Sequence, residues 1–169
     1  MIKIDDYKFY VNESFLDYPD NTSLAVIFYM PGCDRKCVGC QNSELKKFEK
    51  FENKEKLVEF LIIYLRRSNT NKLVLQGGDP LFKDNLELTR FILQKMGDKY
   101  DICIYTGADI DEVKKLNLRG FKYIKCGKFE QKKFVGSIKT DEYIRFATTN
   151  QYLINDKFEC ISKENIYYF

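Results

Sequence analysis

The sequence predicts an α/β fold built around a mainly parallel sheet. Short apolar runs typical of buried strands alternate along the chain with segments in which apolar residues recur every three or four positions, as they do in helices. Strands that alternate with helices pair in parallel through right-handed crossovers. The 169 residues include 14 Phe and 12 Tyr, so the chain can bury a sizeable core, and a single domain over 1–169 is the simplest organisation.

The expected strands are short apolar runs separated by polar or glycine-containing turns. After an N-terminal segment with a run at 7–11, they lie at 24–29, 72–76, 101–105 and 121–126, and two shorter ones lie at 143–146 and 151–154.

Three helices are expected between these strands. The clearest covers 54–67, where leucine, valine and isoleucine recur at helical spacing. The second begins at Asp84, an N-cap with Glu87 three residues on as a capping box, and continues to about Met96. A brief helix follows at 109–116.

Three of the six cysteines, Cys33, Cys37 and Cys40, lie within eight residues directly after the first strong strand. Three thiolates can hold three irons of a cubane cluster, whereas ferredoxin-type clusters normally receive four cysteines. The spacing therefore indicates a 4Fe-4S cluster with one open iron. A zinc site and three reduced core thiols are the alternatives, but structural zinc needs four Cys or His ligands and the chain has no histidine.

A second motif, Gly77-Gly78-Asp79-Pro80, follows the strand at 72–76. Ligands of parallel sheets bind beyond the carboxyl ends of the strands, and paired glycines let backbone approach a ligand closely. Alone, the motif is better explained by an ordinary strand-to-helix turn that Pro80 stiffens. Its place after a three-cysteine loop favours a binding role.

Composition limits the remaining possibilities. A net charge of +3 from 28 basic and 25 acidic residues is too balanced for a nucleic-acid-binding surface. No apolar run approaches the ~20 residues that span a bilayer, and the chain does not start like a signal peptide. Six cysteines without an export signal favour the cytoplasm. The missing histidine excludes Ser-His-Asp and Cys-His catalysis.

Several motifs, in order, resemble those of one family. They are the loop 31–45, Gly77–Leu81, Tyr105-Thr106-Gly107, Lys125–Phe129 and Ala147–Gln151, with Leu16–Pro19 ahead of the first strong strand. Together they are similar to the motifs of the anaerobic ribonucleoside-triphosphate reductase activating proteins, glycyl-radical activases of the radical S-adenosylmethionine superfamily. The resemblance covers about residues 15–155.

The resemblance implies a partial β/α barrel, open on one side, with about five or six mainly parallel strands. It implies a 4Fe-4S cluster on Cys33, Cys37 and Cys40, and S-adenosylmethionine on its open iron. An electron from the cluster would cleave this cofactor to a 5'-deoxyadenosyl radical, which would take hydrogen from a glycine of anaerobic ribonucleotide reductase. Flavodoxin or ferredoxin would supply the electron.

The residues expected to contact S-adenosylmethionine lie in the same motifs. They are Gly39, Cys40, Gln41, Asn42, Gly77, Gly78, Asp79, Pro80, Thr106, Lys125, Asn150 and Gln151. Some of them have structural alternatives. Asn42 could order the cluster loop through side-chain hydrogen bonds or be an ordinary turn residue, and Thr106 could cap the helix before Asp109. Lys125 could pair with the cofactor's carboxylate, although most lysines are solvated, and Asn150 and Gln151 could bond loop backbone. Cys103 and Cys126 lie in apolar strand patterns and are expected in the core.

Two other functions stay open at this point. One is a compact radical S-adenosylmethionine enzyme for a small molecule or peptide, similar to 7-carboxy-7-deazaguanine synthase. The other is a non-enzymatic metal or electron-transfer module, which leaves the glycine motif and Asn150-Gln151 without a role.

Overall fold

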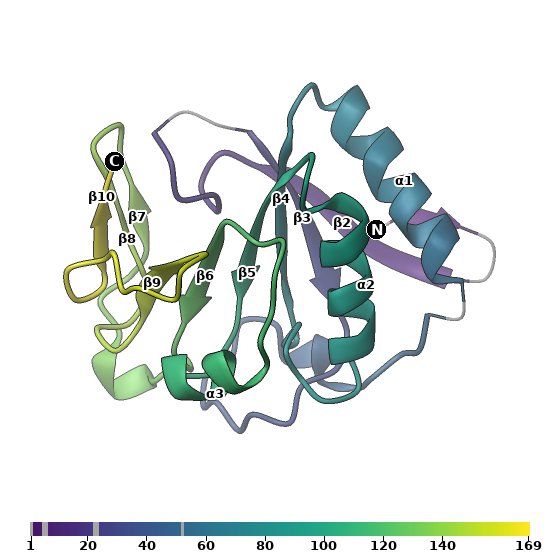
Figure 1. Ribbon diagram of the computed structural model, residues 1–169. Helices are drawn as coiled ribbons and strands as arrows, with labels where there is room; N and C mark the ends of the chain where they lie inside the picture. Colours follow the sequence, from purple (N-terminus) through teal and green to yellow (C-terminus); the bar gives the residue numbers. More distant parts are fainter. Residues whose placement is uncertain (1, 5–6, 22–23, 52) are drawn as a thin grey trace.

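A computed structural model describes residues 2–4, 7–21, 24–51 and 53–169, and its centre is a seven-stranded sheet (Figure 1). The strand order is β1-β2-β3-β4-β5-β6-β9. The strands are β1 (Ile2–Ile4), β2 (Tyr7–Ser14), β3 (Ala25–Met30), β4 (Lys72–Gly77), β5 (Asp101–Tyr105), β6 (Tyr123–Cys126) and β9 (Tyr152–Asn155). The four strands β3 to β6 pair in parallel, whereas β2 and β9 join them antiparallel.

The α/β class with a parallel central sheet is therefore confirmed. The sheet differs from the expected five or six mainly parallel strands in having antiparallel strands at both ends. The physical reason at one end is connection length, because the segments that join β1 to β2 and β2 to β3 are too short for the crossover that parallel pairing requires. At the other end, β9 returns to β6 from the opposite direction.

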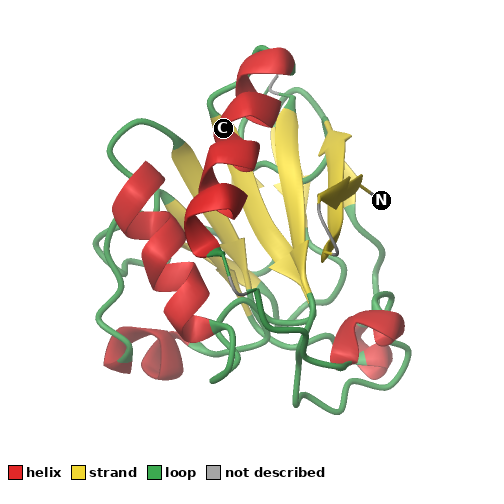
Figure 2. Ribbon diagram, turned by 90° about the vertical axis from the view of Figure 1, so that its right-hand side faces the viewer, coloured by secondary structure: helices red, strands yellow, loops and turns green. Residues whose placement is uncertain are grey.

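Two helices, α1 (Lys54–Arg67) and α2 (Leu86–Met96), cover one face of the sheet (Figure 2). Their apolar stripes, which include Leu57, Leu61 and Ile92, pack on the inward residues of β3, β4 and β5 and form the main core. The expected helix at 54–67 is confirmed, and Asn53 caps it by accepting a hydrogen bond from the amide of Lys56. The short third helix, α3 (Ile110–Lys115), is capped by Asp109.

The predicted start of the second helix is wrong. Asp84 is not its N-cap: α2 begins after Asn85, and the Asn85 side chain makes no capping bond. Glu87 forms no capping box and pairs instead with Lys54, at 2.5 Å. Asn85 is buried, and its amide donates to the carbonyl groups of Gly32 and Asp79. This tertiary role takes the residue away from local capping.

The opposite face of the sheet is covered by two segments. Tyr18, in the bend between β2 and β3, is buried against Ala25, Ile27, Val74 and Cys103. Beside it lies a small antiparallel sheet of order β10-β8-β7. Its strands are β7 (Ile138–Lys139), β8 (Tyr143–Arg145) and β10 (Ile166–Tyr168). The apolar C-terminal segment thus packs on the body of the protein.

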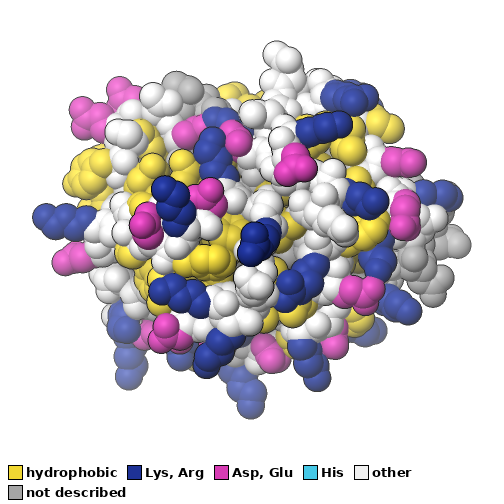
Figure 3. Space-filling model, viewed as in Figure 1, with side chains coloured by type: hydrophobic (Ala, Val, Ile, Leu, Met, Phe, Trp, Pro, Cys, Tyr) yellow, Lys and Arg dark blue, Asp and Glu magenta, His cyan; other side chains and the backbone are white. Residues whose placement is uncertain are grey.

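Two short 3-10 helices, Ser43–Lys46 and Gln131–Lys133, lie in the loops near the sheet's carboxyl end. Among the described residues, no helix is long and apolar enough to cross a membrane. On the face seen in Figure 3, Lys and Arg side chains are interspersed with Asp and Glu.

Candidate functional site

The candidate site lies where the parallel strands β3 to β6 end. Met30 at the end of β3 is in register with Gly77 at the end of β4, so the cysteine loop and the glycine motif leave the sheet side by side. Loops after all four strands surround a cavity of about 580 Å³, a volume typical of cofactor sites. Strand alternation predicted this convergence, because parallel strands present their carboxyl ends at one edge.

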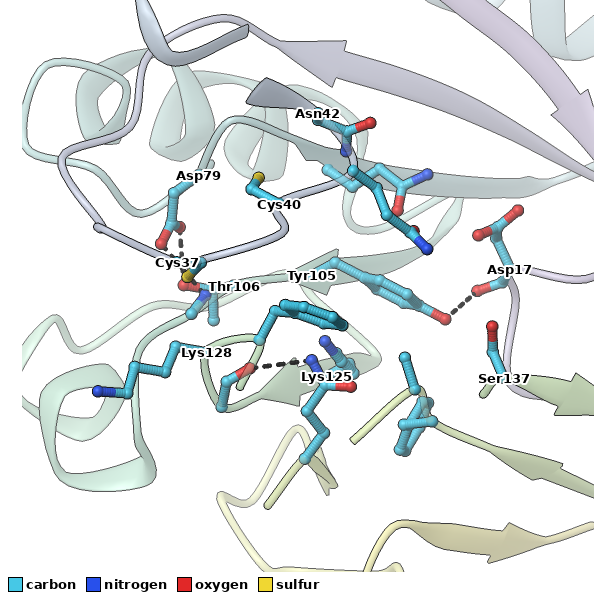
Figure 4. Close-up of a pocket in the computed structure, with 18 of the residues that line it drawn as sticks. Asp17, Cys37, Cys40, Asn42, Asp79, Tyr105, Thr106, Lys125, Lys128 and Ser137 are labelled. Atoms are coloured by element: carbon cyan, nitrogen blue, oxygen red, sulfur yellow. Dashed lines mark hydrogen bonds between the residues drawn. The ribbon is translucent and has the colours of Figure 1, made fainter. Parts of the chain in front are cut away.

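All three clustered thiols line this cavity, and each is partly exposed. Figure 4 shows two of them, Cys37 and Cys40. Burial raises the pKa of the Cys33 thiol. In the described part of the chain, no three Cys, Asp or Glu side chains gather around a point that would suit a single metal ion. A cubane cluster needs a wider arrangement, because each thiolate binds a different iron. Three accessible thiols on one cavity wall fit that requirement.

The glycine motif is packed directly against the cysteine loop. The amides of Gly78 and Asp79 donate to the carbonyl groups of Met30 and Gly32, each at 2.8 Å. A Cβ on Gly78 would lie 2.4 Å from the Gly32 carbonyl oxygen and 2.8 Å from that of Leu45. Both distances are shorter than van der Waals contact. Gly78 lines the cavity, but its missing side chain makes room for the cysteine loop as well as for any ligand.

Asp79 is the centre of the hydrogen bonds between the loops. Its buried carboxylate accepts from the Leu81 amide at 2.9 Å and the Thr106 hydroxyl at 2.7 Å. Its other oxygen accepts from Arg35 Nε at 3.0 Å and the Gly107 amide at 3.2 Å. These four bonds occupy the carboxylate, so its role in this geometry is to join the loops after β3, β4 and β5.

Two asparagines fasten the cysteine loop to its neighbours. The Asn42 amide donates to the Gly77 carbonyl at 3.2 Å, which is the ordering role that the sequence suggested for it. Asn85 bonds the carbonyl groups of Gly32 and Asp79 at 3.2 and 3.0 Å. The loop is therefore tied from both of its ends to the glycine motif.

Lys125 stands in the same cavity, at the end of β6 (Figure 4). Its ammonium lies 5.4 Å from the centre of the Tyr105 ring, and Tyr105 in turn donates to the Asp17 carbonyl at 2.6 Å. Burial lowers the pKa of Lys125 to about 8. No described carboxylate lies within ion-pair distance of it. This cation is available to a negatively charged group in the cavity.

The remaining predicted residues divide into two groups. Gln41 and Gln151 line the cavity, although the Gln151 amide already bonds backbone, donating to Gly127 and accepting from Thr148. Outside the lining lie Gly39, Pro80 and Asn150. The amide of Asn150 donates to the Lys128 carbonyl at 2.9 Å.

Thr106 lines the cavity, but its hydroxyl bonds Asp79 and accepts from the Ala108 amide; the cap of α3 is Asp109. The thiols of Cys103 and Cys126 are buried in the core, as expected, and Cys160 is exposed.

The hydrogen bonds of the site include Arg35, Asn85 and Glu112, which were not singled out from the sequence. Arg35 donates both to Asp79 and to the Glu112 carboxylate of α3. The sequence offered one signal for Arg35, its position between Cys33 and Cys37. A charged side chain there needs a partner of opposite charge once the loop is packed.

Comparison with known proteins agrees with this site. Residues 22–151 match the family model of the 4Fe-4S single cluster domain. The chain is also 29% identical, over 125 residues, to the anaerobic ribonucleoside-triphosphate reductase-activating protein of Enterobacteria phage T4. That alignment covers 68% of this chain and 77% of the phage protein. The resemblance drawn from the motifs is thereby confirmed, and the chain belongs to the family of the 4Fe-4S single cluster domain.

Proposed function

We propose that this member of the 4Fe-4S single cluster family is a radical S-adenosylmethionine activase of anaerobic ribonucleotide reductase. The observation that carries the proposal is the meeting of Cys33, Cys37 and Cys40 with Gly77 and Gly78 around one cavity. The similarity to a reductase-activating protein supports the choice of partner. The proposed reaction is reductive cleavage of S-adenosylmethionine, followed by removal of hydrogen from a glycine of the reductase.

The residues present fit the cluster and the cofactor. Three thiols with no histidine in the chain are a donor set for a cubane cluster with one open iron. Such a cluster would supply the electron for cofactor cleavage. The Lys125 ammonium would pair with the cofactor's carboxylate, because it has no acidic partner among the described residues. The backbone of Gly77 and Gly78 would meet the methionine end.

Further parts of the proposal concern architecture and partners. We propose that residues 1–169 form one radical S-adenosylmethionine domain and that the observed sheet would be its partial barrel, a proposal supported by the parallel pairing of β3 to β6. The open side would admit the glycine-bearing loop of the reductase. Flavodoxin or ferredoxin would reduce the cluster. All six cysteines are unpaired, which suits the reducing cytoplasm.

Anaerobic reconstitution tests the metal centre. The wild-type chain should take up about four irons and four sulfides, as expected for a cubane cluster. Cys37→Ala should lose the cluster, whereas Cys160→Ala, which changes an exposed cysteine outside the cavity, should keep it. Stoichiometric zinc without iron–sulfur absorbance would contradict the proposal.

The activase reaction is tested with the reduced, cluster-loaded chain, S-adenosylmethionine and the cognate reductase. The mixture should yield 5'-deoxyadenosine, methionine and a doublet radical signal on the reductase. That signal should vanish when the radical-site glycine of the reductase is changed to alanine. If a small molecule drives 5'-deoxyadenosine formation while the reductase gains no radical, the small-molecule enzyme replaces the activase.

A further inference from the structure

The cysteine loop carries its own charged anchor, Arg35, between the first two cysteines. Its Nε donates to Asp79 at 3.0 Å, and its terminal nitrogens donate to the two oxygens of Glu112 at 3.2 and 3.4 Å. One guanidinium thus spans two carboxylates that belong to different elements. The planar, five-donor guanidinium allows this double pairing, whereas a lysine ammonium has a single nitrogen.

Both carboxylates are held in place independently of Arg35. Asp79 is buried and accepts from the Leu81 amide and the Thr106 hydroxyl. Glu112 is the N3 residue of the α3 capping box, and its carboxylate accepts from the Asp109 amide at 2.9 Å. Because Asp79 and Glu112 are fixed, their bonds to Arg35 determine where the arginine side chain lies. The cysteine loop that carries Arg35 is therefore positioned by the rest of the protein.

Gly107 provides the space that this arrangement needs. A Cβ there would lie 2.4 Å from Arg35 Cδ and 2.9 Å from its Nε. The arginine side chain therefore passes directly over the Gly107 backbone. Since the guanidinium is bonded at its far end, the side chain cannot move aside without lengthening those bonds. This contact explains physically why the Tyr105-Thr106-Gly107 motif has a glycine at its third position.

We propose that Arg35 is a positioning residue that fixes the first half of the cysteine loop before a cluster binds. Through Asp79 and Glu112 it couples the position of Cys33 and Cys37 to the loop after β5 and to α3. The inference deepens the proposed function and rests on it only in taking this loop as the cluster loop. We call the contacts of Arg35 with Asp79 and Glu112 the clamp. These contacts lie within the cluster-free chain.

Amide hydrogen exchange in the full, cluster-free chain tests the clamp. The amides of Cys33 and Asp79 are bonded across the loops, to Lys46 and Gly32. In Arg35→Met they should exchange at least about tenfold faster, the factor expected on losing a hydrogen bond to a charged group. Arg35→Lys should stay close to Arg35→Met. Lys36→Met, at the exposed neighbouring position, should resemble the wild type.

The clamp is overturned if Arg35→Met leaves both amides at wild-type rates while α1 and β4 stay protected. Should Arg35→Met fail to fold, Glu112→Gln is the second variant, since glutamine keeps the capping-box acceptor and loses the charge. It should speed exchange about threefold, because one of the two carboxylate partners is weakened. Wild-type rates at the Cys33 and Asp79 amides in Glu112→Gln would equally overturn the clamp.

A double-mutant cycle tests the contact with Gly107 separately. Gly107→Ala alone should speed exchange of the Cys33 amide about tenfold, since it displaces the same side chain. In an Arg35→Ala background, the added Gly107→Ala should change the rate less than about twofold. If the two substitutions instead raise the exchange rate by factors that multiply, Arg35 and Gly107 are not coupled and the proposed contact is overturned. A wild-type chain that takes up no cluster would count against the proposed function and leave these exchange results unaffected.

Discussion

Gly78→Ala tests whether the glycine motif is required by packing. An added Cβ would approach the carbonyl oxygens of Gly32 and Leu45 to 2.4 and 2.8 Å. Both are backbone atoms that already hold the loop: Gly32 donates to Leu45 at 2.7 Å and accepts from Asp79 at 2.8 Å. Neither can rotate away as a side-chain end would. The loop must therefore move outward by about an ångström to reach ordinary contact.

The expected cost follows from this geometry. Overpacking of this kind costs ~1–3 kcal/mol, and replacing glycine by alanine returns ~0.4–1 kcal/mol through the unfolded state. Gly78 is outside the left-handed region, so no backbone strain is added. The free energy of unfolding should fall by ~1–2 kcal/mol. Urea denaturation of the cluster-free chain measures it, and cluster uptake should slow because the cysteine loop is displaced.

Gly136→Ala is the matched control. A Cβ there meets nothing within 4 Å, although the backbone is left-handed with φ +77°. It should therefore show a backbone cost of ~1–2 kcal/mol with normal cluster uptake. If Gly78→Ala keeps wild-type stability and cluster uptake and only weakens S-adenosylmethionine binding, the packing explanation is refuted and the glycine serves the ligand alone.

Two further predictions concern charged groups of the cavity. Asp79→Asn should lower the free energy of unfolding by ~2–4 kcal/mol, because an amide NH2 in place of one carboxylate oxygen cannot accept from both Arg35 and the Gly107 amide. A change below ~1 kcal/mol by denaturation would contradict the role of Asp79 in joining the loops. Lys125→Met should stabilise the cluster-free chain at pH 7 by at most ~3 kcal/mol. Burial lowers the Lys125 pKa from 10.5 to about 8, so the unfolded chain binds more protons between these values and wild-type stability rises with pH across that window. The stabilisation by Lys125→Met relative to the wild type should therefore shrink from pH 8 upward and vanish above about 10.5. A stabilisation that does not change with pH would contradict the lowered pKa of Lys125.

Local patterns predicted the elements whose formation depends on local signals. The helix over 54–67 has a full amphipathic period and a capping asparagine, and it is observed over Lys54–Arg67. The strand at 101–105 matches β5 because a buried central strand is a continuous apolar run. The short strand expected at 143–146 is likewise observed, as β8. By contrast, β7 has only two residues, too few to show a period, and it depends on pairing with β8.

In the candidate site, the sequence predicted where residues lie but not which of them bond one another. The order of the motifs and the alternation of strands were enough to bring Cys40, Gly78, Thr106 and Lys125 to one cavity. They could not show which polar groups bond one another. Asp79 was expected at the cofactor, yet four partners from its own chain occupy its carboxylate. Such partners depend on side-chain directions between loops far apart in the sequence.

The contrast between Asp79 and Lys125 separates scaffold from binding group in this cavity. Both are charged residues at strand ends that line it. The acid has its full set of donors, so it contributes by holding three loops together, and a ligand that displaced one donor would leave that donor unpaired. The lysine forms no ion pair with any described carboxylate, its ammonium lies near the Tyr105 ring, and burial lowers its pKa, so its charge is poorly compensated. A carboxylate entering the cavity would find in Lys125 a buried cation that no described carboxylate neutralises.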